Sequence, residues 1–258
     1  MPVAVSPNAI LLPGVVLPQD LAYGALIEAL GPDVGAHAKD LEVYATDEPP
    51  SDYGLALEID GVLREADASG FERFHLVGYS AGGAIATALA ARHPDRLLSL
   101  ALLEPAWIGN DKISDDERRI WREFRELAGL PPDEMMLRFV RLQLAEGVAP
   151  PSPPPGRPPP WMAKRPAGIR AVTEEFTSYD LPSDRLRSFD RPVYFALGGL
   201  SNPDFHGRTA ERAGELFEDF TLEVFAERHH FDPPHRAEPE RLASSLQTLW
   251  RRAQQPVG

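Results

Sequence analysis

Residues 78–82 constrain this chain more than any other stretch, because they read Gly-Tyr-Ser-Ala-Gly. The apolar segment 74–77 before them suits a buried strand, and the alanine-rich segment 83–93 after them is typical of a helix. A serine in a tight turn between a strand and a helix presents its hydroxyl above the edge of a sheet. The turn needs both of its glycines, since a side chain at either place would collide. Ser80 is therefore the candidate nucleophile.

The composition limits the partners of this chain. Its 258 residues include 39 acidic and 26 basic ones, a net charge of −13, which disfavours nucleic acid and anionic membranes as partners. Without cysteine the chain has no thiol nucleophile, disulfide or cysteine-bound metal, and its seven histidines show no metal-ligand spacing. We therefore expect no metal and no cofactor, and a small molecule as the partner.

The N-terminal residues and the lengths of the apolar segments indicate where the protein is located. The first residues lack the basic start and long apolar run of a signal peptide, and no stretch is long enough to span a bilayer. We predict a cytoplasmic protein, with the alanine, arginine and proline content favouring a bacterial source. A monomer and a homodimer both remain open.

Strand and helix patterns alternate along most of the chain. Apolar segments typical of strands lie at 9–12, 41–44, 74–77, 97–103, 192–197 and 222–225, and helical patterns separate most of them. This alternation predicts an α/β fold with a mostly parallel sheet of about six strands and helices on both faces. The rhythm changes between 105 and 190, where a capping box at 114–117 opens a helix and a proline-rich stretch follows at 150–160. We expect a core from 1–104 and 191–258, interrupted by a helical lid at 105–190.

Taken together, these features resemble the α/β-hydrolase superfamily. The resemblance rests on Leu-Pro-Gly-Val-Val at 12–16 after the first strand, the turn at Ser80, the helical insertion, and His-Phe-Asp-Pro-Pro-His at 230–235 before the last helix. It covers nearly the whole chain. It implies an α/β-hydrolase fold and a catalytic triad in the order serine, acid, histidine.

The resemblance places the catalytic base in the loop after the last strand. Members of the superfamily often read Gly-His-Phe there, and His230 aligns best with that histidine. His229 and His235 are the alternatives. The base must be a neutral imidazole, so that its nitrogen can accept the serine proton near pH 7.

The acid is less directly indicated. Where the superfamily commonly carries aspartate after the strand at 192–197, this chain has Asn202, which cannot stabilise an imidazolium as a carboxylate does. Glu104 ends the apolar strand at 97–103 and resembles the acid position of haloalkane dehalogenases. A carboxylate there needs a partner, which His230 would provide. Glu104 is the predicted acid, and Asp204 is the alternative.

The oxyanion hole needs two backbone donors. The resemblance assigns one to the N–H of Ala81 and the other to the loop after the first strand. That loop reads Pro-Gly-Val where many relatives read His-Gly-x, which makes Val15 the candidate and Val16 the second choice.

These residues predict a serine hydrolase that forms an acyl-enzyme with a carboxylic ester or a related acyl compound. Aromatic and apolar residues of the expected lid, among them Trp121, Phe124 and Phe139, favour a small to medium, largely apolar substrate. Lactone hydrolysis and carbon–carbon bond cleavage use the same triad. A slow or non-catalytic binding protein on this fold, and an acyltransferase, are the alternatives.

Overall fold

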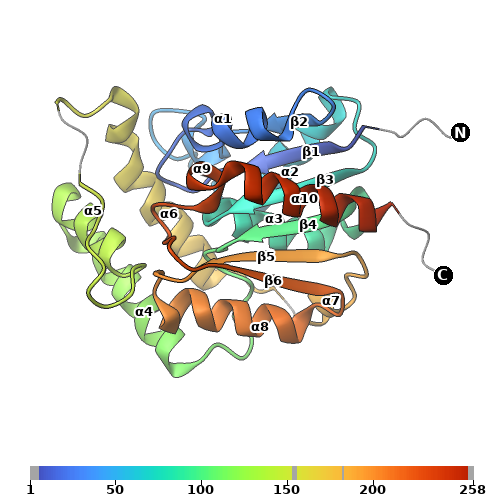
Figure 1. Cartoon of the computed structure of the whole chain (residues 1–258). Helices are drawn as coiled ribbons and strands as arrows, with labels where there is room; N and C mark the ends of the chain where they lie inside the picture. The colour runs from blue at the N-terminus through green and yellow to red at the C-terminus, as the bar shows by residue number, and fades with distance from the viewer. Residues whose placement is uncertain (1–5, 153–155, 182, 255–258) are drawn as a thin grey trace, which may run out of the picture.

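The computed structural model describes residues 6–152, 156–181 and 183–254, and all statements below concern these residues. Their strands form one sheet of six, in the order β2-β1-β3-β4-β5-β6, and every neighbouring pair is parallel (Figure 1). The strands are β1 Asn8–Leu12, β2 Gly35–Ala38, β3 Phe74–Tyr79, β4 Leu97–Leu103, β5 Val193–Gly198 and β6 Phe220–Phe225. The predicted fold class is confirmed.

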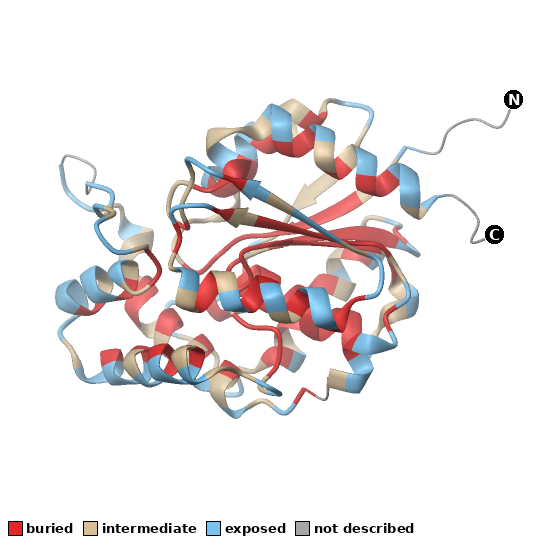
Figure 2. Cartoon of the chain, turned by 60° about the horizontal axis from the view of Figure 1, so that its bottom comes forward, coloured by how far each residue is buried: buried red, intermediate tan, exposed pale blue. Residues whose placement is uncertain are grey.

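Two apolar layers cover the sheet because successive strand residues point to opposite faces. In β1, Ile10 and Leu12 pack on one face with helices α2, α3 and α8, while Ala9 and Leu11 pack on the other with α1 and α10. Figure 2 shows the inner sides of these helices and most of the sheet as buried. The helices are α1 Gln19–Leu30, α2 Leu55–Ala68, α3 Ala81–Arg92, α8 Arg208–Leu216 and α10 Pro239–Ala253, with the short α9 Pro234–Ala237 before the last.

The second strand is not the one that the sequence predicted. Segment 41–44 has the bulky apolar pattern of a strand, yet Glu42–Tyr44 forms a 3-10 turn, η1. The carboxylate of Glu58 fixes this turn by accepting the N–H groups of Glu42 and Val43, at 2.8 and 3.0 Å. The strand is instead Gly35–Ala38, which reads Gly-Ala-His-Ala, is half-buried and has no β-branched residue to give a β signal.

Helices α4, α5 and α6 lie beyond the carboxyl ends of the strands, at the left of Figure 1. They span Asp115–Glu126, Pro132–Arg141 and Arg165–Ser178. The predicted capping box opens α4, where the N–H of Glu117 donates to the Ser114 hydroxyl at 3.1 Å and the N–H of Ser114 donates to the Glu117 carboxylate at 2.9 Å.

The remaining short helices connect these parts. They are η2 Pro94–Arg96, η3 Leu127–Gly129, η4 Pro160–Lys164, α7 Ser183–Arg187 and the π-helical turn η5 Pro203–Gly207. Helix α7 packs against α3 and α8, so the end of the expected insertion lies on the core. Part of the proline-rich stretch at 150–160 falls outside the described residues. Within the described part of the chain, no helix combines the length and apolar character that crossing a bilayer requires.

Candidate active site

Ser80 occupies a strained turn between β3 and α3. Its backbone has φ 53° and ψ −117°, in the region that L-residues rarely adopt. A Cβ on Gly78 would lie 2.3 Å from the carbonyl oxygen of Gly82, and a Cβ on Gly82 would lie 2.3 Å from the carbonyl oxygen of Leu12. Both glycines are therefore required by contacts with backbone, as the sequence predicted. The N–H of Ser80 donates to the carbonyl of Leu103 at 3.1 Å and ties the turn to β4.

Three residues that are distant in the sequence meet above this turn. The Ser80 Oγ lies 3.1 Å from Nε2 of His230, and Nδ1 of the same ring lies 3.0 Å from Oε2 of Glu104. All three are buried, with at most 4% of each residue exposed. The structure thus brings together the serine, histidine and acid that the sequence nominated, in hydrogen-bonding order.

Glu104 is held at the end of β4 with φ 44°, another left-handed conformation for a residue other than glycine. Its Oε1 accepts the N–H of Gly198 at 2.7 Å, while Oε2 faces His230. Its own N–H donates to the carbonyl of Ala196 at 3.1 Å. Both carboxylate oxygens are therefore partnered, which offsets the cost of burying the charge and aims Oε2 at the imidazole.

The surroundings of His230 favour its neutral form. Burial lowers the pKa of its imidazole well below the ordinary value of 6.5. The ring lies 4.9 Å from the ring of Tyr79, whose hydroxyl donates to the backbone carbonyl of His230. A neutral imidazole held in this way has a free Nε2 lone pair directed at the serine hydroxyl.

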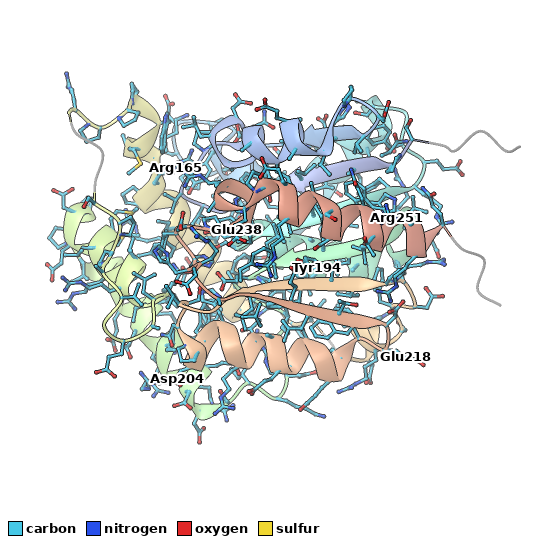
Figure 3. All side chains as sticks on the ribbon, in the orientation of Figure 1. Arg165, Tyr194, Asp204, Glu218, Glu238 and Arg251 are labelled. Carbon is cyan, nitrogen blue, oxygen red and sulfur yellow. The ribbon has the colours of Figure 1, made fainter. Side chains whose placement is uncertain are left out.

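The alternative acid lies elsewhere. Asp204 is at the edge of the molecule (Figure 3), its side chain is 47% exposed, and its carboxylate pairs with Arg119 at 3.0 Å. Asn202, at the common position of the acid, caps this turn by accepting the N–H of Asp204 and donates to the carbonyl of Leu142 at 2.7 Å. This asparagine has a structural role, and its side chain makes no hydrogen bond to His230 in the described part of the chain.

The alternative histidines have other surroundings. Nδ1 of His229 accepts the N–H groups of Phe231 and Asp232, both at 3.1 Å, so it folds the loop back on itself. His235 is buried in α9 and packs against the rings of Tyr23 and Tyr79. Neither contacts Ser80 through a hydrogen bond.

The predicted oxyanion loop lies against the turn. The N–H of Gly82 donates to the carbonyl of Pro13 at 3.1 Å, and a Cβ on Gly14 would lie 3.1 Å from the Cβ of Ser80. Val15 and Ala81 line the same cavity as Ser80. Among the described residues, neither of their N–H groups donates to a protein acceptor, so both are free for an oxygen atom of a ligand.

A cavity of about 340 Å³, counting its opening to solvent, lies over Ser80. Most of its apolar lining comes from residues of the expected lid at 105–190. Its polar side chains include Gln143 and Thr173 beside Ser80. Of the lid residues that the sequence singled out, Trp121, Phe124 and Phe139 line the cavity. Others, such as Trp107, Ile108 and Met135, do not line the cavity and belong to the same buried apolar cluster as these three.

Sequence reasoning missed His206, which stacks on His230 with ring centroids 4.3 Å apart and planes 19° from parallel. It lies in η5, just past the turn at 198–204, and no motif marks it. Donor atoms of His206, His230 and Glu104 lie within 4.8 Å of one another, and these residue types can bind zinc. However, each imidazole nitrogen binds a metal in the plane of its own ring. The planes of these two rings are nearly parallel, so their lone pairs do not point to one common ion.

The sequence has detectable relatives. A profile of the alpha/beta hydrolase fold family matches residues 45–128. The dihydrolipoyllysine-residue acetyltransferase component of the acetoin cleaving system of Cupriavidus necator is 34% identical over 99 residues, which cover 34% of this chain and 26% of that protein. A putative carbamate hydrolase, RutD of Caulobacter segnis, is 38% identical over 38% of this chain and 49% of its own length. The chain thus spans less than half of either relative.

Solved structures match nearly the whole chain. A bacterial membrane phospholipase A has a TM-score of 0.71 at 21% identity and covers 98% of this chain and 81% of its own. An esterase of Thermogutta terrifontis has a TM-score of 0.71 at 17% identity, with coverages of 96% and 91%. The 2-hydroxy-6-oxo-6-phenylhexa-2,4-dienoate hydrolase of a Rhodococcus strain has a TM-score of 0.65 at 18% identity, with 95% and 91% covered. At these identities the similarity establishes a shared fold.

Proposed function

We propose that this chain, which has the α/β-hydrolase fold, is a serine hydrolase that cleaves small to medium, largely apolar carboxylic esters. The observation that carries the proposal is the continuous set of contacts from Glu104 through His230 to Ser80, at 3.0 and 3.1 Å. Esterases among the structures with the same fold support the choice of an ester.

The contacts suggest a role for each group. His230 accepts the proton of Ser80 through Nε2 as the serine oxygen attacks the ester carbonyl. Glu104 holds Nδ1–H and stabilises the imidazolium that forms, while the N–H groups of Val15 and Ala81 bind the oxyanion. His230 then gives the proton to the leaving alcohol. Water repeats the sequence on the acyl-enzyme and releases the acid.

The cavity supports the proposed substrate class. Aromatic and aliphatic side chains form most of its lining, as in sites that bind apolar ligands. Helices α4 to α6 stand over the serine, and we propose that residues 105–190 act as a lid, with the core in 1–104 and 191–258. Gln143 and Thr173 give the cavity polar contacts for orienting a substrate.

Two alternatives predict different outcomes. A ligand-binding protein with little or no catalytic activity would turn over esters little faster than background. The assembled triad argues for turnover. An acyltransferase would favour an alcohol, amine or thiol over water as the acceptor, which a product analysis in mixed acceptors distinguishes.

Labelling with a fluorophosphonate probe tests the proposal directly. We expect one adduct on Ser80 by intact mass and peptide mapping, and steady turnover of short-chain and aromatic esters. Ser80→Ala should remove the adduct and lower kcat by a factor on the order of 10⁴ or more. A folded wild-type protein that neither labels nor hydrolyses any ester of the panel would contradict it.

A further inference from the structure

The ring of His206 contacts the ring of His230, yet its nitrogens bind nothing. The residue is fully buried, and neither Nδ1 nor Nε2 has a hydrogen-bond partner among the described residues. The two rings are 4.3 Å apart at their centroids and 19° from parallel. An unpaired polar ring in such a place is costly, and a smaller apolar side chain would avoid that cost.

His206 does not take part in proton transfer in this arrangement. Burial and, to a smaller extent, the neighbouring His230 lower the pKa of its imidazole to about 3 against the opposing effect of the Glu104 carboxylate, so His206 is neutral at the pH where His230 acts as a base. Its nitrogens do not reach Ser80 or Glu104 through any hydrogen bond. What His206 offers His230 is the face of a neutral aromatic ring.

We propose that His206 is a positioning residue whose ring face holds His230 in line with Ser80 and stabilises the imidazolium formed during catalysis. The inference rests on the proposed serine hydrolase function. The proton leaves Ser80 Oγ and binds His230 Nε2, and it later passes to the leaving alcohol. His206 neither gains nor loses a proton. A cation over a neutral aromatic face is attracted to its π electrons, and most strongly where water is excluded.

Other groups also act on the charge of His230, and the test must separate them. Those that face it are the Glu104 carboxylate at 3.0 Å, the ring and hydroxyl of Tyr79, and, through space, His229 and the His235 imidazole. His206 and Tyr79 present rings to His230, and Tyr79 is also bound to its backbone. A change at His206 therefore isolates the ring contact.

The test compares His206→Phe with His206→Leu. Phenylalanine keeps an aromatic face without any ring nitrogen, whereas leucine has a similar bulk without a face. We expect the Phe variant to retain kcat/KM within about threefold, and the Leu variant to lose about tenfold. The acid limb of the pH profile should move to lower pH in the Leu variant, because the imidazolium of His230 has lost stabilisation. His75→Leu, at a buried histidine near the start of β3 that stacks on Trp250, is the matched control and should leave the limb in place.

The rate of fluorophosphonate labelling, measured across the same pH range, gives a second readout that needs no ester turnover. Thermal unfolding shows that each variant is folded. If the Phe and Leu variants react at equal rates and neither shifts the acid limb, the inference is overturned and His206 only fills space beside His230. If both variants lose activity equally and strongly, the role belongs to the ring nitrogens of His206 and not to its aromatic face. Labelling without ester turnover would remove the proposed function alone. No labelling in folded wild type would remove both.

Discussion

We propose Glu104 and not Asp204 as the catalytic acid because the two carboxylates have different surroundings. Glu104 is 3% exposed and shares its oxygens between Gly198 and His230, whereas Asp204 is half exposed and paired with Arg119. In the buried site, a carboxylate beside the imidazole stabilises the charge that develops on it, and water competes little. The exposed ion pair of Asp204 with Arg119 is screened by water, so its carboxylate has little electrostatic effect on distant groups.

Exchanging each carboxylate for its amide should separate the two residues. We expect Glu104→Gln to lower kcat by a factor on the order of 10⁴, since the amide cannot compensate the imidazolium charge. Asp204→Asn is the matched control and should leave kcat within about twofold. Steady-state kinetics on the best ester of the panel measure both, and a larger loss in the Asp204 variant would transfer the acid role to it.

Single glycines also determine the site. Gly82→Ala would bring a Cβ to 2.3 Å from the carbonyl of Leu12, a backbone atom in a central strand that cannot move aside. We expect a loss of about 3 kcal/mol or more in the free energy of unfolding, and loss of labelling at Ser80. Gly24→Ala, in α1 with nothing within 4 Å, is the control and should stabilise the fold by about 0.5 to 1 kcal/mol. Denaturant titrations compare the two, and similar values would refute the steric argument.

At the scale of elements, η1 links helix α6 to the oxyanion loop. The Tyr44 hydroxyl donates to the carbonyl of Val15 at 2.8 Å, and the Arg165 guanidinium of α6 lies 3.9 Å over the Tyr44 ring. Burial raises the pKa of Tyr44 to about 12, so its hydroxyl keeps the proton that it donates. The turn that replaces the expected strand at 41–44 thus fixes the loop that we propose carries an oxyanion donor.

Removing that hydroxyl should slow catalysis. We expect Tyr44→Phe to lower kcat about tenfold, because the loop loses a hydrogen bond worth about 1 kcal/mol and gains freedom at the donor. Tyr194→Phe removes a comparable hydroxyl, bonded to Glu223 at 2.7 Å away from the site, and is the control. It should cost similar stability with kcat unchanged. If both variants keep full activity, the link through Tyr44 does not position the loop.

For the whole molecule, buried histidines couple folding to pH. Burial lowers the pKa of His75, His206, His230 and His235 to about 3, well below their ordinary 6.5. Below about pH 6.5 the unfolded chain therefore binds protons that the folded chain does not. This contribution to stability is complete above pH 6.5 and is lost as the pH falls toward 3.

We expect the free energy of unfolding to drop by roughly 3 to 5 kcal/mol between pH 6 and pH 5, at about 1.4 kcal/mol per histidine and pH unit. Urea titrations at a series of pH values measure the slope, and His235→Phe should reduce it by about one proton. A slope of one proton or less in the wild type would show that these side chains are not held neutral.

The sequence alone determined the features that depend on neighbouring residues. Gly78 and Gly82 reveal the turn because steric demands are local, and alternating apolar segments reveal the parallel sheet because strand and helix periods differ. Glu104 stood out as a charge at the end of an apolar strand. The capping box at Ser114 was likewise readable, since its partners are three residues apart.

Tertiary structure decided what depends on contacts between distant segments. Glu104 and His230 are 126 positions apart in the sequence, and Ser80 and His230 are 150 positions apart. The order of the strands in the sheet brings them together. Segment 41–44 has strand propensity, but the Glu58 carboxylate of α2 accepts two of its N–H groups and holds it as a turn. Residues 35–38 form the edge strand of the sheet in its place. His206 has no signal in the sequence, because the stacking of one ring on another is a property of the folded chain alone.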